Sequence, residues 1–140
     1  MSERTGMSVD LGTTPEAFVS NFFNSYGKEV VFGSENPGQD VDRYYTPDFT
    51  QIADGAEMTR QQLVDHIPAA RQTFEKMHYD VQEALLSGTT LATRFTFHGT
   101  LKSGGAIEVE FYLFAEVTED RRLSRIHQVT RTLKNDMAAG

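Results

Sequence analysis

The sequence predicts a single α+β domain, with helices in the first half of the chain and an antiparallel meander in the second. Three observations support this prediction. Apolar residues recur at helical spacing after Pro15 and again after Thr59. Three long strand-like segments joined by two short turns then occupy Leu91–Leu133. The length of 140 residues suits one domain with a single core.

The first helix is expected to begin at Pro15. Thr14 supplies a hydroxyl cap, Pro15 suits the first helical position, and Glu16 adds an acid to the first turn. Gly27 is a plausible end. The helix then carries a strongly apolar face, formed by Phe18, Val19, Phe22, Phe23 and Tyr26.

The next segment is expected to be irregular. Residues 28–39 are predicted to form a loop, and Asp40–Tyr45 a short helix ended by Pro47. A short strand over Phe49–Ala53 then closes at the Asp54-Gly55 turn.

A second helix is expected after Thr59, because Thr59 and Gln62 form a capping box. Pro68 should bend this helix about one turn earlier. A strand over Tyr79–Leu86 follows and ends at Ser87-Gly88. The apolar stripe of the helix is Leu63, Ile67, Ala70 and Phe74.

The register of the last two strands follows from charge pairs. A four-residue loop at 119–122 places Glu116 opposite Arg125 and Glu110 opposite Arg131, and such pairs favour one register. The inner face then carries Ile107, Val109, Phe111, Leu113, Ala115 and Val117 from one strand, and Ser124, Ile126, Gln128 and Thr130 from the next.

The preceding hairpin has two possible registers. A two-residue Ser103-Gly104 turn directs Arg94, Thr96 and His98 inward, whereas a three-residue Ser-Gly-Gly loop directs Phe95 and Phe97 inward instead. We prefer the first, which the family resemblance described below supports. The outer face then carries Phe95, Phe97, Tyr112, Phe114, His127 and Val129.

So aromatic a face should not stay in water, and a second copy of the same sheet is its simplest cover. We therefore expect a homodimer through this face. The alternative is that the helices cover it and the other face is solvated.

Composition excludes several classes of function. The net charge of -7 argues against nucleic acid and anionic membranes as partners. The absence of cysteine excludes disulfides and thiolate sites, and is compatible with the cytoplasm. We find neither a signal peptide nor a membrane span. The four histidines lack metal-ligand spacing, so we expect no metal and no cofactor.

Three features together resemble the nuclear-transport-factor-2-like superfamily and, within it, SnoaL-like proteins. They are the apolar first helix followed by DVDRYYTPDF, the capped segment from TRQQL to ARQTF, and the run from ATRFTFHGT to RIHQ. The resemblance covers Pro15–Leu133. It implies a curved sheet wrapped around helices as a cone with a hydrophobic pocket at its open end, often dimerised through the outer face. The domain would span residues 13–134, between a flexible arm, 1–12, and a tail, 135–140.

The resemblance leaves the activity open, because function depends on the site rather than the fold. Relatives catalyse polyketide cyclisation, steroid isomerisation, dehydration or epoxide hydrolysis, while others only bind or assemble. The positions that correspond to the catalytic residues of steroid isomerases fall near Ser20, Ala53 and Leu113. The pair of residues that stabilises the oxyanion in those enzymes is therefore lost here. The Arg-x-Asp pair of limonene-epoxide hydrolases reads Arg94-Phe95-Thr96, so only its arginine matches. SnoaL-like cyclases pair a carboxylate with a histidine, but the last strand offers only Gln128 and Thr130.

The sequence nevertheless offers candidate site residues. Asp54 and His98 are candidate catalytic bases, the alternatives being a turn aspartate and a solvated histidine. Arg94 is the first candidate for ligand binding, because a buried arginine needs a carboxylate or an oxyanion as partner. The other candidate ligand-binding residues are Thr96, Gln128, Tyr45 and His66, of which Tyr45 also suits the core and His66 a helix surface.

Two functions therefore remain open. One is a cofactor-independent enzyme acting on a small hydrophobic carbonyl compound by acid–base chemistry. The other is a non-catalytic ligand-binding or dimeric accessory module with the same pocket.

Overall fold

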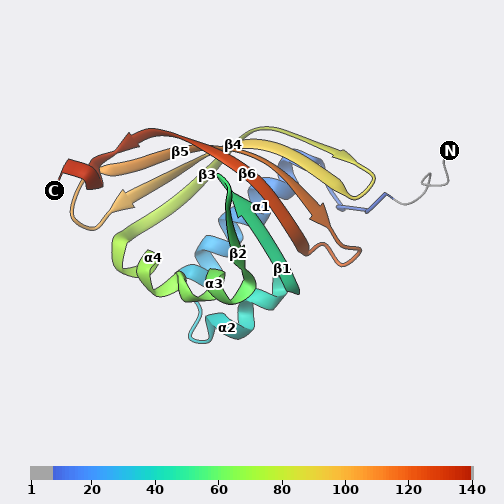
Figure 1. The fold of residues 1–140 in the computed structure, drawn as a ribbon, viewed down its shortest axis with the longest axis horizontal. Coiled ribbons are helices and arrows are strands. Elements are labelled where there is room, and N and C mark those ends of the chain that lie inside the picture. Colours follow the sequence, from blue (N-terminus) through green and yellow to red (C-terminus); the bar gives the residue numbers. More distant parts are fainter. Residues whose placement is uncertain (1–7, 140) are drawn as a thin grey trace.

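In the computed structural model, which describes residues 8–139, a six-stranded sheet arches over a layer of helices (Figure 1). The strands are β1 (Tyr45–Ala53), β2 (Ala56–Thr59), β3 (Phe74–Ser87), β4 (Thr90–Leu101), β5 (Ala106–Val117) and β6 (Leu123–Asn135). The helices are α1 (Pro15–Tyr26), α2 (Pro37–Asp40), α3 (Arg60–Asp65) and α4 (Ile67–Thr73). The α+β prediction is confirmed.

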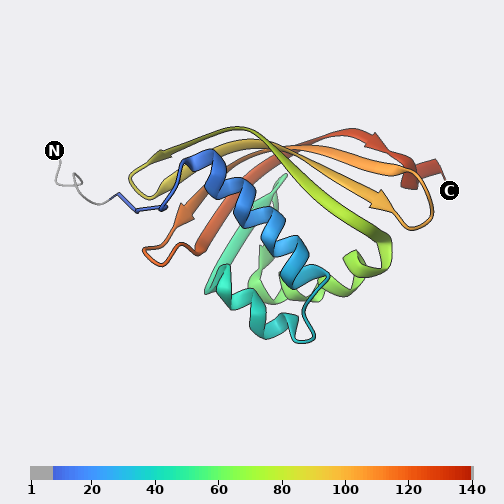
Figure 2. The ribbon, with the colours of Figure 1, turned by 180° about the vertical axis from the view of Figure 1, so that it is seen from behind.

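The strand order is β2-β1-β6-β5-β4-β3, and β1 runs parallel to β6 while the other neighbours are antiparallel. The sheet is therefore mixed rather than wholly antiparallel. No hairpin joins β1 to β6, so chain connectivity does not impose an antiparallel pairing on them. The helices lie on the inner face of the curved sheet. Figure 2, which views the molecule from behind, shows α1 lying across that face.

The α1 helix begins as predicted. The Thr14 hydroxyl accepts a hydrogen bond from the Ala17 amide, and Pro15 occupies the first turn. The α-helix ends at Tyr26 with Gly27 as its C-cap, as predicted, but Gly27 keeps helical backbone angles and the chain continues as a π-helical segment, Gly27–Val31. The predicted apolar face is buried against the sheet, with Phe18, Val19, Phe22, Phe23 and Tyr26 all in the core.

The segment before β1 differs from its prediction. The helix expected over Asp40–Tyr45 lies earlier, as α2 and a 3₁₀ turn at Val41–Arg43, and Tyr45 already belongs to β1. Pro47 lies inside β1 where the pairing with β6 shifts register, which is the kind of irregularity that tolerates a strand proline. The Asp54-Gly55 turn after β1 is confirmed, with Ala53 paired to Ala56.

The capping box of the second helical region is confirmed. Thr59 and Gln62 exchange both side-chain-to-backbone hydrogen bonds. The helix breaks at His66, because Pro68 lies in the first turn of a separate helix, α4, which begins at Ile67. Phe74 starts β3 instead of ending the helix.

The β5–β6 register is confirmed, with Glu116 opposite Arg125 and Glu110 opposite Arg131. The preferred β4–β5 register is wrong. Phe95 pairs with Phe111 and Thr100 with Ala106, one residue away from the register expected of a Ser103-Gly104 turn. Gly104 and Gly105 both have positive φ, at 99° and 89°, and close a longer loop than either alternative assumed.

The shift exchanges the two faces of β4. Phe95 and Phe97 lie inward, 1% and 9% exposed, so neither belongs to the outer face as predicted. Arg94, Thr96 and His98 share the opposite parity and lie outward. The observed register buries two phenylalanines rather than an arginine and a histidine. It is favoured because burying each phenylalanine stabilises the fold by about 1.5–3 kcal/mol, whereas burying a charged or polar side chain is costly.

The segment before α1 packs on the domain. Residues 1–7 of the predicted flexible arm lie outside the described residues, but Val9 and Leu11 are buried in the core. The Val9 amide donates to the Gly88 carbonyl at 3.1 Å, and the Arg121 side chain donates to the Asp10 carbonyl at 2.9 Å. Within the described part of the chain, no helix has the length and apolarity needed to cross a membrane.

Candidate functional site

Two adjoining cavities, of about 240 and 220 Å³, lie between the inner face of the sheet and the helices. They share five lining residues, and we call them together the cone cavity. The shared residues are Tyr26, Leu63, His66, Tyr79 and Phe111. The first cavity adds Val31, Ile67, Ala70, Met77 and Phe97, and the second adds Phe23, Tyr45, Gln51, Met58, Phe95, Ile126 and Gln128.

Tyr26 is the polar residue of α1 that reaches this cavity. Its ring stands edge-on to Tyr44 and Tyr45, with ring centres 5.3 and 5.4 Å away, so its direction is fixed by packing. Its hydroxyl is buried and has no hydrogen-bond partner among the described residues. Burial raises the pKa of Tyr26, so the hydroxyl keeps its proton at neutral pH. An unpaired buried donor in a cavity wall calls for a ligand or water as its partner.

Tyr45 and Tyr79 line the cone cavity beside Tyr26. Burial raises the pKa of Tyr79 to about 12 and that of Tyr45 well above its usual range, so both are hydrogen-bond donors rather than phenolates. The Asn24 side chain holds the backbone of Tyr79. It accepts from the Tyr79 amide at 2.9 Å and donates to the Tyr79 carbonyl at 3.1 Å.

The remaining polar lining consists of two amides and one imidazole. Gln51 and Gln128 contribute amides from β1 and β6, and the Gln51 amide lies 3.9 Å from the Met58 sulfur. His66 lies between α3 and α4, lines both cavities and is exposed, so it stands at their open side. No Asp, Glu, Lys or Arg is among the described residues that line the cone cavity.

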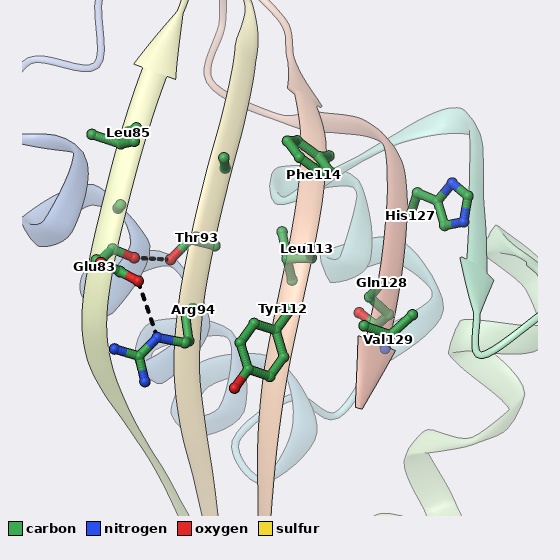
Figure 3. Close-up of a pocket in the computed structure, with 12 residues that line it drawn as sticks. Glu83, Leu85, Thr93, Arg94, Tyr112, Leu113, Phe114, His127, Gln128 and Val129 are labelled. Atoms are coloured by element: carbon green, nitrogen blue, oxygen red, sulfur yellow. Dashed lines mark hydrogen bonds and ion pairs between the residues drawn. The ribbon is translucent and has the colours of Figure 1, made fainter. Parts of the chain in front are cut away.

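A larger hollow of about 510 Å³ lies across β3, β4, β5 and β6 on the outer face (Figure 3). Its polar centre is an ion-pair network. Arg94 lies 3.1 Å from Glu83 and 3.3 Å from Glu110, and Tyr112 donates to Glu110 at 2.6 Å. The hydrogen bond that Arg94 donates to Glu83 raises the pKa of Arg94, while the hydrogen bond from the Tyr112 hydroxyl lowers the pKa of Glu110. Arg94 is thus a paired residue of the outer face.

Thr96 and His98, which were also predicted to face inward, have partners on the outer side as well. Thr96 lies 3.3 Å from the Gln82 side chain. The His98 ring lies between Asp80, at 3.0 Å, and Glu108, at 3.3 Å. The predicted placement of Arg94, Thr96 and His98 inside the cone is wrong, because Phe95 and Phe97 of the same strand face inward instead.

Asp54 occupies the β1–β2 turn with a positive φ of 51°. Its carboxylate accepts hydrogen bonds from the amide and the hydroxyl of Thr130, at 2.9 and 2.6 Å. The hydroxyl bond is the main reason that the pKa of Asp54 is lowered. This exposed carboxylate therefore resembles a turn cap, and we leave it out of the proposed site.

Three sequence candidates do meet in the cone cavity, namely Tyr45, His66 and Gln128. Sequence reasoning missed Tyr26, Tyr79, Gln51 and Met58. The helical spacing of Tyr26 assigned it to the core stripe, which is correct, but spacing cannot show that its hydroxyl lacks a partner. Among the described residues, no group of three metal-binding side chains converges.

The comparisons with known proteins agree with this architecture. The model of the SnoaL-like domain matches residues 30–126. An uncharacterised protein of Schizosaccharomyces pombe is 28% identical over 95 residues, covering 68% of this chain and 72% of its own.

Solved structures share the fold at low sequence identity. A protein from Catenulispora acidiphila with a ketosteroid isomerase-like fold, solved with trimethylamine, has a TM-score of 0.58, 18% identity and coverage of 83% and 85% of the two chains. A candidate SnoaL-like polyketide cyclase from Jannaschia sp. has a TM-score of 0.59, 13% identity and 91% coverage of both. The chain therefore belongs to the SnoaL-like family, with the nuclear-transport-factor-2-like cone fold.

Proposed function

We propose that the cone cavity binds a small, uncharged, mainly apolar molecule whose hydrogen-bond acceptor receives the Tyr26 hydroxyl. The observation that carries the proposal is this buried hydroxyl, unpartnered among the described residues, in a mainly apolar wall that holds no carboxylate, lysine or arginine among those residues. A carbonyl compound fits, because three protonated tyrosines can donate to its oxygen while aromatic rings pack on its body. The relatives described as polyketide cyclases agree with a ligand of this class.

The charge of the cavity sharpens the ligand class. Moving an anion into an apolar cavity with no cation to pair with it is costly. No arginine or lysine lines the cone cavity among the described residues, and the arginine expected there is paired on the outer face. The proposed ligand is therefore a ketone or a similar neutral acceptor rather than a carboxylate.

The charge preference is tested with two molecules on one bicyclic frame. We expect 2-tetralone, a neutral ketone, to bind saturably by isothermal titration calorimetry. Its carboxylate counterpart, 1,2,3,4-tetrahydro-2-naphthoate, is expected to bind at least about tenfold more weakly, the ratio that corresponds to about 1.4 kcal/mol. Equal binding of the two would contradict an uncharged ligand class.

Tyr26→Phe tests the hydroxyl directly. Removing one hydrogen bond of about 1–1.5 kcal/mol should weaken 2-tetralone binding roughly tenfold while the ring still packs. Tyr112→Phe is the matched control, because its hydroxyl serves Glu110 on the outer face. If Tyr26→Phe binds 2-tetralone as tightly as the wild type does, the proposed contact is refuted.

A second observation favours a homodimer through the outer face. In the described part of the chain no helix covers this face (Figures 1 and 2), and it exposes Leu85, Tyr112, Phe114 and Val129, at 72%, 40%, 60% and 53%. Both signs of charge lie beside them, as Figure 3 shows for Arg94 and Glu83. A face that is apolar and carries both charges is self-complementary about a two-fold axis. A second copy is therefore the proposed cover, although Phe95 and Phe97 take no part. We keep the cytoplasmic location as a prediction.

A further inference from the structure

We infer that His78, Asp80 and His98 form a binding site for a divalent transition-metal ion, and that Glu108 orients His98 as its outer partner. The four side chains lie on the outer face of β3, β4 and β5, and none of them lines the cone cavity. The inference therefore does not rest on the proposed function. The spacing of the histidines along the chain predicted no metal, but strand pairing brings two of them together.

Strand pairing gathers these side chains on one face of the sheet. His78 of β3 lies directly opposite His98 of β4, and Asp80 follows His78 by two residues, so it points to the same side. Glu108 of β5 lies directly opposite His98 on its other flank. Opposite residues on neighbouring strands have Cβ atoms about 4.5–5.5 Å apart, which is close enough for their side chains to share a ligand.

The Asp80 carboxylate lies between the two imidazoles. One of its oxygens is 2.7 Å from His78 Nε2, and the other is 3.0 Å from His98 Nε2. As the side chains stand, they bond to one another and do not converge on a single point. Ligand atoms about 2.0–2.2 Å from a tetrahedral zinc ion lie roughly 3.3 Å apart, so a widening of about half an ångström would admit the ion.

The surroundings of His98 call for a cation. Its Nε2 faces Asp80 at 3.0 Å, and its Nδ1 faces Glu108 at 3.3 Å. A neutral imidazole has one N–H, so one nitrogen would turn a lone pair toward a carboxylate oxygen. Either a second proton or a metal ion on Nε2 removes this conflict. The metal ion leaves Nδ1 to donate to Glu108, which is the usual arrangement of a ligand histidine and its outer carboxylate.

The charged neighbours on this face leave the cluster negative. Glu110 of β5 lies 3.1 Å from Arg131, and Lys134 of β6 lies 3.9 Å from Asp136. Lys76, nearer the start of β3, is exposed. With neutral imidazoles the cluster carries the two negative charges of its own carboxylates, which a divalent ion would balance.

The ligand types define the class of ion. Two imidazole nitrogens and one carboxylate suit zinc and the neighbouring first-row ions, whereas magnesium and calcium prefer oxygen ligands alone. Three protein ligands leave a fourth position for water, which can enter because His78 and Asp80 are 60% and 55% exposed. Zinc is therefore the probe ion. Magnesium is the control for non-specific attraction to a chain of net charge -7.

Imidazole NMR tests the site, because the chain has four histidines and two of them belong to the cluster. Zinc chloride at about pH 7.5, where free imidazole is mostly neutral, should shift the ring signals of His78 and His98 saturably and with one dissociation constant. The signals of His66 and His127 should stay in place. Zinc affinity should fall as the pH is lowered, because protons compete for the ligand nitrogens.

Substitutions locate the ion. Losing an outer partner usually costs about 10–100-fold in metal affinity, so Glu108→Gln should weaken zinc binding by about that factor. His78→Ala and Asp80→Asn remove direct ligands and should each weaken it by at least about 100-fold. Both positions are exposed, so these variants should fold. His127→Gln, at an exposed histidine of β6, is the matched control and should bind zinc as the wild type does.

Three results would overturn the inference. Zinc that leaves the His78 and His98 signals unmoved would show that protons alone hold the cluster together. Unchanged zinc affinity in Asp80→Asn would place the ion elsewhere. Equal shifts with magnesium and zinc would show a diffuse attraction to negative charge instead of a site built from imidazoles.

Discussion

Tyr26 and Asp54 are two polar residues that differ in burial and in hydrogen bonding. Tyr26 lines the cavity and its hydroxyl is buried without a partner among the described residues, whereas the Asp54 carboxylate is exposed and receives two hydrogen bonds from Thr130. We propose the unsatisfied group as the donor to a ligand, while the satisfied one stabilises a turn. This contrast is the reason for preferring the tyrosine over the aspartate as a site residue.

The ionisation of Asp54 should make the free energy of unfolding depend on pH. Its pKa is lowered on folding, so the stabilisation is present above the usual aspartate value of 3.8 and is lost as pH falls through the lower folded value. We expect Asp54→Asn to reduce the free energy of unfolding at neutral pH, because asparagine keeps the turn conformation but not the charge. The difference from the wild type should shrink below pH 3.8.

The measurement is urea denaturation of both proteins at a series of pH values. Asp65→Asn, which removes an exposed helix carboxylate, controls for the change in net charge. A difference between wild type and Asp54→Asn that is constant over the acid range would contradict the role assigned to Thr130.

At the scale of elements, local chemistry predicted some features well. The Thr14 cap, the Thr59–Gln62 capping box and the Asp54-Gly55 turn all formed where the sequence placed them. The β5–β6 register followed from two charge pairs. The β4–β5 register was not predicted correctly. A Ser-Gly-Gly segment accepts several loop lengths, and a change of one residue in the register changes which side chains face inward. The predicted site was therefore wrong at Arg94 and His98, which lie on the outer face of the sheet instead of the inner face.

The contact between α1 and β3 carries a prediction at this scale. β3 is an edge strand of the sheet, and the Asn24 side chain satisfies both backbone groups of Tyr79 on it. Asn24→Ala should lower the free energy of unfolding by about 1–3 kcal/mol, because these groups would lose their partner. It should also weaken 2-tetralone binding, since Tyr79 would no longer be held in the cavity wall.

Chemical denaturation and calorimetry measure the two effects. Asn36→Ala is the control, because Asn36 is exposed and its side-chain amide donates only to the Gln39 side chain among the described residues. Unchanged stability of Asn24→Ala would show that the Asn24–Tyr79 contact contributes nothing.

At the scale of the whole molecule, the sheet separates two apolar surfaces for which we propose different uses. The inner face, with the helices, encloses the cone cavity, and the outer face is the proposed dimer surface. Hydrophobic pattern alone predicted that both faces of the sheet would be apolar. It could not assign the polar side chains to either face, because that assignment depends on strand register.

The dimer proposal predicts the effect of one surface charge. Phe114→Glu should convert a dimer to a monomer in light scattering at micromolar concentration, because it places a charge in the apolar part of the interface. Phe32→Glu makes the same change at an exposed phenylalanine after the π-helical segment and should leave the dimer intact. A wild-type protein that is already monomeric would contradict the proposal.

The central claim is that the ligand occupies the cone cavity rather than the outer hollow. Methionine methyl NMR tests it directly, because Met77 and Met58 line the two parts of the cavity and Met137 is exposed in the C-terminal turn. Titration with 2-tetralone should shift the Met58 and Met77 methyl signals saturably and with one dissociation constant, while Met137 stays in place. Saturable binding that leaves both cavity methyl signals unmoved would contradict the claim.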